Sequence, residues 1–131
     1  MDFELFNTYS NKTELFIPLD DNDIRIYACG PTVYDYIHVG NARPLIIFDV
    51  LVRFLKLIYP KVTYVRNITD VDDKIIVQAN QNKESINNLT ERTIKAFSDD
   101  ADALFVKKPD FEPRATEPVS YTHLTLPTIL P

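Results

Sequence analysis

Two strand-like runs on either side of one long apolar run limit this chain to a small set of folds. Ile24–Cys29 alternates and is rich in β-branched and aromatic residues, which predicts a strand, and Lys61–Thr69 has the same character. Asn41–Tyr59, between them, is mostly apolar with helical spacing, and its length favours a largely buried helix. Strand, helix and strand within about 45 residues predict a βαβ unit with a right-handed crossover and a parallel sheet.

The flanking segments predict one more strand and two more helices. Glu14–Asp20 is expected to be a short strand. Asp70 resembles a helix N-cap, with Asp72 and Asp73 in the first turn, where the helix dipole favours acidic side chains. A metal-binding carboxylate cluster is the alternative interpretation of these three residues. Ser85–Val106 carries an apolar stripe at helical spacing, which predicts the last helix.

Composition excludes several classes of protein. The 131 residues suffice for one domain or part of a larger one, and no apolar run approaches the ~20 residues of a membrane span. The N-terminus lacks the features of a secretory signal, and the single cysteine rules out an internal disulfide, so we expect a cytoplasmic location. The net charge of −5 argues against strong binding of nucleic acid by this chain alone.

The chain concentrates its rare residues in the connection from the first strand of the βαβ unit to its helix. Both glycines, Gly30 and Gly40, lie there together with Cys29 and His38. Ligands of open α/β sheets bind at the carboxyl ends of strands, and a helix N-terminus offers free N–H groups to phosphate. Gly40 would let a nucleotide approach the backbone, and His38 and Asn41 would donate hydrogen bonds to it. The pattern predicts a nucleotide site, although an isolated cysteine is more often a small buried hydrophobe.

Four segments of the chain resemble one enzyme family. His38–Asn41 (HVGN) resembles the HIGH motif of class I aminoacyl-tRNA synthetases. The wider Cys29–Pro44, together with Leu5–Leu19, Tyr64–Ile75 and Pro109–Glu117, resembles cysteinyl-tRNA synthetases in order and spacing. The resemblance implies an α/β fold, the first half of a class I synthetase Rossmann-like nucleotide-binding fold with a parallel sheet and a βαβ crossover.

Two alternatives stand beside this family. The related cysteine ligases of mycothiol synthesis typically have proline where this chain has Val33 and Lys74, which favours the synthetase. A non-catalytic half-Rossmann module that binds ATP or a protein partner is the other alternative. Arg66 and Lys74 are interpreted as surface or ion-pair residues rather than catalysts.

The resemblance implies a cysteine–tRNA ligase, which activates L-cysteine with ATP and transfers it to tRNA-Cys. Cys29 matches one ligand of a zinc ion, a metal for which thiolate is a suitable ligand and which would also bind the substrate thiolate. Gly30 and Thr32 would border the bound cysteine.

The same resemblance assigns the ATP-binding HIGH-type motif to Pro31–Asn41. His38, Gly40 and Asn41 would bind ATP, which enters with magnesium. His38 and Asn41 are the expected catalytic residues, because they would stabilise charge at the α-phosphate during adenylation. Asn41 stands where the family often has histidine, and it still carries a donor.

The family's further motifs are not found in this sequence. Three more zinc ligands, the KMSKS loop and the anticodon-binding helices belong to parts of the family enzyme that this chain does not contain. We therefore expect residues 1–118 to be the N-terminal part of the catalytic domain, a fragment inactive on its own. Residues 119–131 contain no charged residue, and their sequence VSYTHLTLPT matches a translated sequencing adapter. We expect this tail to be non-native.

Overall fold

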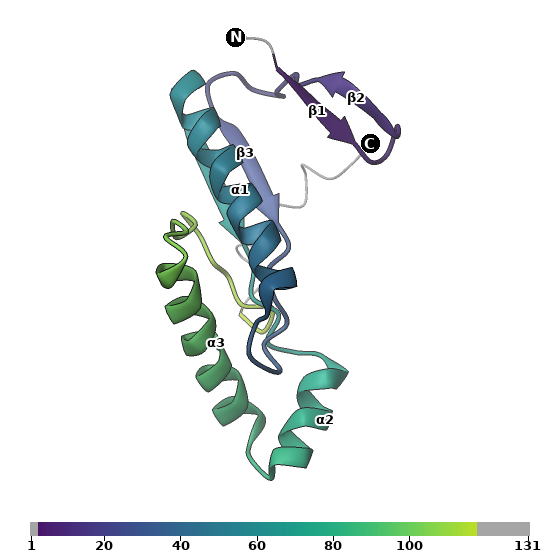
Figure 1. The fold of residues 1–131 in the computed structure, drawn as a ribbon, viewed down its shortest axis with the longest axis vertical. Helices are drawn as coiled ribbons and strands as arrows, with labels where there is room; N and C mark the ends of the chain where they lie inside the picture. Colours follow the sequence, from purple (N-terminus) through teal and green to yellow (C-terminus); the bar gives the residue numbers. More distant parts are fainter. Residues whose placement is uncertain (1–2, 118–131) are drawn as a thin grey trace.

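The predicted βαβ unit forms the centre of the molecule (Figure 1). The computed structural model describes residues 3–117 of the chain. Strand β3 (Ile24–Ala28) pairs in parallel with β4 (Val62–Arg66), and helix α1 (Val39–Ile58) connects them and lies along the pair. The parallel pairing and the helical crossover confirm the predicted fold class.

One face of α1 packs on the β3–β4 pair, and the other face is open. The first hydrophobic cluster joins the helix to both strands through Ile24, Ala28, Val52, Leu55, Val62 and Tyr64. Ile46, Ile47, Val50 and Leu57 are exposed on the same helix. The expectation that this helix is largely buried is therefore wrong, because half of the residues of α1 are exposed in the described structure.

A C-terminal segment extends the sheet on the far side of β4. Phe111 and Arg114 form parallel bridges with Val65 and Ile68. Backbone hydrogen bonds of 2.9–3.1 Å join residues 111–115 to residues 66–68. β4 therefore lies between β3 and this segment, and β3 is the outer strand of the described sheet.

Two helices complete the lower half of the molecule in Figure 1, α2 (Asp73–Asn82) and α3 (Ile86–Ala103). The helix predicted at Ser85–Val106 is confirmed as α3, with Ser85 as its N-cap. The N-cap of α2 is Asp72, whose carboxylate accepts from the Lys74 amide at 2.9 Å. Asp70 is not the cap, because its carboxylate accepts instead from the backbone and the hydroxyl of Thr116.

Two further hydrophobic clusters involve these helices. The second cluster joins α2 and α3 to the loops that follow β3 and β4, through Val33, Ile68, Ile75, Ala79 and Leu89. The third cluster joins the start of α1 to the end of α3, through Leu45, Phe97, Ala101 and Val106. The core is therefore divided into three parts rather than gathered at one centre.

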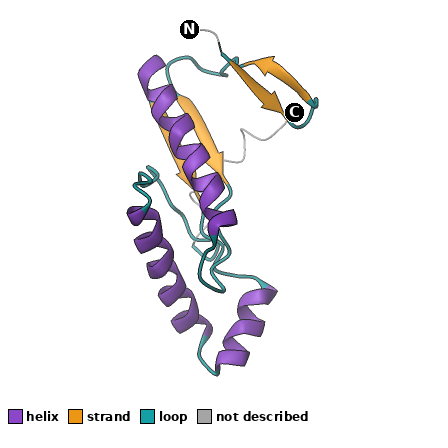
Figure 2. Cartoon of the chain, in the orientation of Figure 1, coloured by secondary structure: helices purple, strands orange, loops and turns teal. Residues whose placement is uncertain are grey.

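A β-hairpin near the N-terminus projects from the rest of the molecule (Figure 2), while Phe3 and Phe16 at its base pack against the first hydrophobic cluster. It consists of β1 (Glu4–Asn7) and β2 (Lys12–Leu15), which pair antiparallel. The strand predicted at Glu14–Asp20 is confirmed only for Glu14 and Leu15 and is wrong beyond them, because β2 ends at Leu15. None of the helices in residues 3–117 combines the length and apolarity that a membrane span requires.

Candidate functional site

Side chains at the start of α1 cap the helix by hydrogen-bonding its first backbone amides. His38 is the N-cap, and its Nδ1 accepts a hydrogen bond from the Gly40 amide at 3.0 Å. In return, Asn41 Oδ1 accepts from the His38 amide at 3.1 Å, which completes a capping box. Because Nδ1 is an acceptor here, neutral imidazole carries its proton on Nε2. The exposed His38 thus has an N–H donor to offer beyond the helix.

Gly40 is required by the position of the His38 ring. A Cβ on Gly40 would lie 2.7 Å from His38 Cε1 and 2.9 Å from Nδ1. A side chain at this position would therefore push the imidazole away from the helix start and break the cap.

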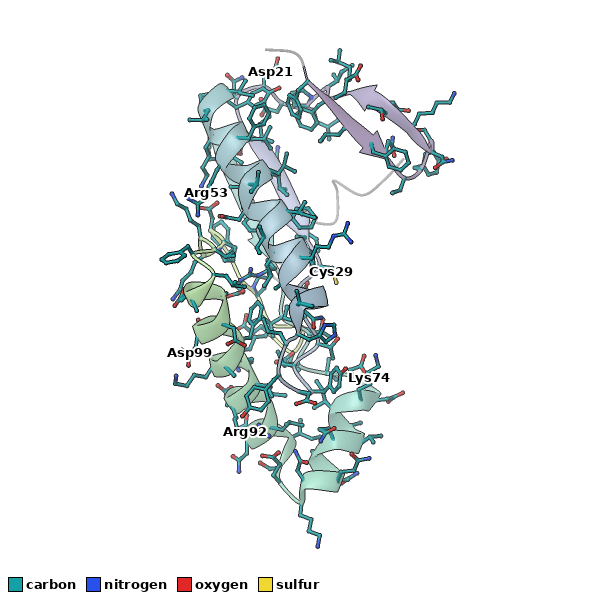
Figure 3. The ribbon with its side chains drawn as sticks, viewed as in Figure 1. Asp21, Cys29, Arg53, Lys74, Arg92 and Asp99 are labelled. Atoms are coloured by element: carbon teal, nitrogen blue, oxygen red, sulfur yellow. The ribbon has the colours of Figure 1, made fainter. Side chains whose placement is uncertain are left out.

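Gly30 is required by a closer backbone approach. A Cβ on Gly30 would lie 1.6 Å from the backbone oxygen of Asn67, a separation that no side chain permits. The Gly30 amide donates to Asn67 Oδ1 at 2.8 Å. Cys29 beside it is an exposed free thiol and lies near the N-terminal half of α1 (Figure 3). Burial, and secondarily the nearby Cys29 thiol, raises the pKa of Tyr27.

The structure brings four of the predicted site residues around one hollow of about 100 Å³, namely Cys29, Gly30, Gly40 and Asn41. Thr32 and His38 do not line it. Thr32 instead forms a parallel bridge with Thr69. The hollow lies at the carboxyl ends of the parallel strands and beside a helix N-terminus, which is the usual place for a ligand in such a sheet.

A buried arginine forms part of the wall of the hollow. Arg66 is 4% exposed, and its Nε and Nη2 donate to Glu112 Oε1 at 2.9 and 2.5 Å. Its guanidinium lies 4.9 Å from the centre of the Phe97 ring, and Nη1 is a buried nitrogen without a hydrogen-bond partner among the described residues. Arg66 thus forms the predicted ion pair but is not at the surface.

Sequence reasoning missed Asn67 and Glu112 as parts of this site, and it had no signal for the pairing of Arg66 with a residue so distant in the chain. Tyr64 also lines the hollow, and burial raises the pKa of its hydroxyl, an effect that the charge of Arg66 partly offsets. Lys74 lies over the Tyr34 ring, 5.6 Å from its centre, and takes no part in the hollow.

The described residues do not by themselves make a zinc site. No group of three or more His, Cys, Asp or Glu side chains within residues 3–117 is arranged to hold a metal ion. Asp72 and Asp73 lie at the start of α2, so the helix-start interpretation holds for these two residues but not for Asp70, whose carboxylate accepts hydrogen bonds from Thr116. Cys29 offers one thiolate, and a stable zinc site needs several ligands.

Comparison with known proteins decides the family. Residues 15–126 match the family model described as the catalytic domain of class I (C) tRNA synthetases. The chain belongs to this family. Its parallel β3–β4 pair with the α1 crossover is the Rossmann-like N-terminal region of such a domain.

Curated relatives of the family are cysteine–tRNA ligases. That of Ehrlichia ruminantium strain Gardel is 55% identical over 113 residues, which are 86% of this chain and 25% of the relative. That of Wolbachia from Drosophila simulans is 54% identical over 117 residues, 89% of this chain and 26% of the relative. That of Pseudomonas fluorescens strain Pf0-1 is 48% identical over 126 residues, 96% of this chain and 27% of the relative. The chain thus spans about a quarter of the length of these relatives.

The expected boundary between residues 118 and 119 stays a prediction. Residues 119–131 lie outside the described residues. The family match continues to residue 126, and the Pseudomonas relative aligns over 126 residues.

Proposed function

We propose that this chain is the first part of the catalytic domain of a cysteine–tRNA ligase. The longer protein joins L-cysteine to ATP and passes the cysteinyl group to tRNA-Cys, and we expect it to act in the cytoplasm. The observation that carries the proposal is the single hollow that Cys29 and Gly30 share with Gly40 and Asn41. Two segments that the sequence separates, the end of β3 and the start of α1, therefore meet where one ligand would touch both.

The two ends of the hollow suit the two halves of a cysteinyl-adenylate. Cys29 and Gly30 would adjoin the amino acid, with Thr32 behind them. The start of α1 would adjoin the α-phosphate, where the Nε2 proton of His38 and the amide group of Asn41 are suitable donors. Arg66 lies in the same wall, but the Glu112 carboxylate balances its charge.

The hollow is too small for a whole nucleotide. Its volume of about 100 Å³ is below the ~300 Å³ at which ligand pockets begin. We propose that the rest of the ATP site and the further ligands of a zinc ion bound through Cys29 come from the longer protein. The chain alone is then inactive.

The proposal is tested by cysteine-dependent ATP–pyrophosphate exchange in the longer protein. We expect exchange with cysteine and little with serine, followed by transfer to tRNA-Cys. Exchange that is absent, or that does not depend on cysteine, would contradict the proposal and favour a binding module. Transfer of cysteine to an amino sugar in place of tRNA would favour the mycothiol-type ligase.

A further inference from the structure

The parallel pairing of the two strand ends contains one extra residue next to the hollow. Ala28 pairs with Arg66, and the next pair is Thr32 with Thr69. Between these pairs, the segment after β3 has three residues, 29–31, and the segment after β4 has two, 67–68. This is a β-bulge, a feature that is rare in parallel pairs and frequent beside active sites, where it redirects a side chain.

The side chain of Asn67 holds this bulge. Its Oδ1 accepts from the Gly30 amide at 2.8 Å, and its Nδ2 donates to Thr69 Oγ1 at 3.3 Å. The strand ladder resumes at once beyond it, where Thr69 donates to the Pro31 oxygen and Val33 donates to the Thr69 oxygen. Asn67 thus replaces the backbone partner that Gly30 loses at the bulge.

The direction of the Cys29 side chain depends on this bulge. Cys29 is the first residue of the bulge, and its thiol contacts the Gly30 oxygen at 3.6 Å and lines the hollow. A Cβ on Gly30 would lie 1.6 Å from the Asn67 backbone oxygen. The two segments therefore lie so close together that only glycine fits at this position. The hydrogen bond from the Gly30 amide to the Asn67 side chain therefore holds the Cys29–Gly30 peptide in its orientation.

We propose that Asn67 is a positioning residue that sets the Cys29–Gly30 corner for the cysteine end of the ligand. It acts through Gly30 and does not touch the ATP end, because the start of α1 is held separately by its own capping box. This inference rests on the proposed function for the identity of the ligand. The hydrogen bond between Gly30 and Asn67 does not depend on the proposed function.

The test uses three variants of the longer protein. Asn67→Ala removes both hydrogen bonds of the side chain, and Asn67→Asp keeps the acceptor for Gly30. Asn82→Ala is the matched control, because Asn82 is exposed on α2 and its side chain bonds Gln78 and Glu84. In pyrophosphate exchange, Asn67→Ala is expected to raise KM for cysteine about tenfold, the low end of the cost of losing a residue that orients a metal ligand, which is the role proposed for Cys29. KM for ATP should not change. Asn67→Asp should recover most of the loss.

A second measurement does not depend on activity. Hydrogen exchange of the Gly30 amide should become about five- to tenfold faster in Asn67→Ala, the effect of one lost hydrogen bond, and should stay slow in Asn67→Asp and Asn82→Ala. An unchanged Gly30 amide in Asn67→Ala, or equal rises in both KM values, would overturn the inference. If the longer protein has no cysteine-dependent exchange, the proposed function fails, while faster exchange of the Gly30 amide would still support the hold of Asn67 on the bulge.

Discussion

Removal of the Glu112 carboxylate should release the segment that extends the sheet beyond β4. The Arg66 side chain is 5% exposed and that of Glu112 is 30% exposed, and two hydrogen bonds of 2.9 and 2.5 Å join them. Glu112→Ala would leave a buried guanidinium with no charged partner. Breaking a fully buried pair costs about 3–5 kcal/mol, and because Glu112 reaches water we expect about 2–3 kcal/mol here.

The cost should appear as local opening of this segment. The amides of Ile68 and Ala115 donate across the junction, to the oxygens of Pro113 and Ile68 at 2.9 Å each. Their hydrogen exchange in the longer protein should become about 30- to 150-fold faster, as 2–3 kcal/mol of lost protection requires. Asp99→Ala is the matched control, because Asp99 contacts Lys95 at 2.6 Å but both side chains are more than half exposed, so it should cost below about 1 kcal/mol. Equal effects of the two variants would refute the reasoning.

Three further predictions concern the proposed site. Cys29→Ser in the longer protein should sharply lower both zinc content and cysteine-dependent pyrophosphate exchange, and near-normal values of both would show that Cys29 is not a ligand. His38→Ala should slow adenylate formation far more than it weakens cysteine binding, because the phosphate contact strengthens in the transition state, and it should also cost about 1 kcal/mol of helix stability. His38→Asn keeps a capping acceptor, so it should restore the melting temperature but not the rate, and equal losses of rate and cysteine affinity would count against the phosphate role. Residues 1–118 alone should show no exchange and a low melting temperature, and a cooperative transition raised by zinc would contradict their inactivity.

The βαβ unit was predictable because its signals are local. Residue type and period alone identified Ile24–Cys29, Asn41–Tyr59 and Lys61–Thr69, and the structure shifts their ends by only a few residues. The sequence placed the start of this helix at Asn41, and the structure places it at Val39. Its N-cap, His38, is not among the usual capping residues, so the sequence did not mark the start.

The remaining features depend on contacts between distant residues. All four residues of β1 and all four of β2 are exposed, so neither strand shows the alternation of a half-buried strand. The pairing of residues 110–115 with β4 and the burial of Arg66 depend on a partner 46 positions away. The role of Asn67 depends on the bulge. A bulge appears only once the strand pairing is known, and no sequence pattern predicts it.

The division of the core has a consequence for how the molecule responds to a ligand. The hollow is lined by Ala28, Phe48 and Tyr64 from the first hydrophobic cluster and by Leu45 and Phe97 from the third. Separate hydrophobic clusters can open and close as separate units, with free energies of their own. A ligand in the hollow would bridge two of these units and be lost when either opens, so its binding energy would couple them. Occupancy would then turn two independent local unfolding events into one cooperative event.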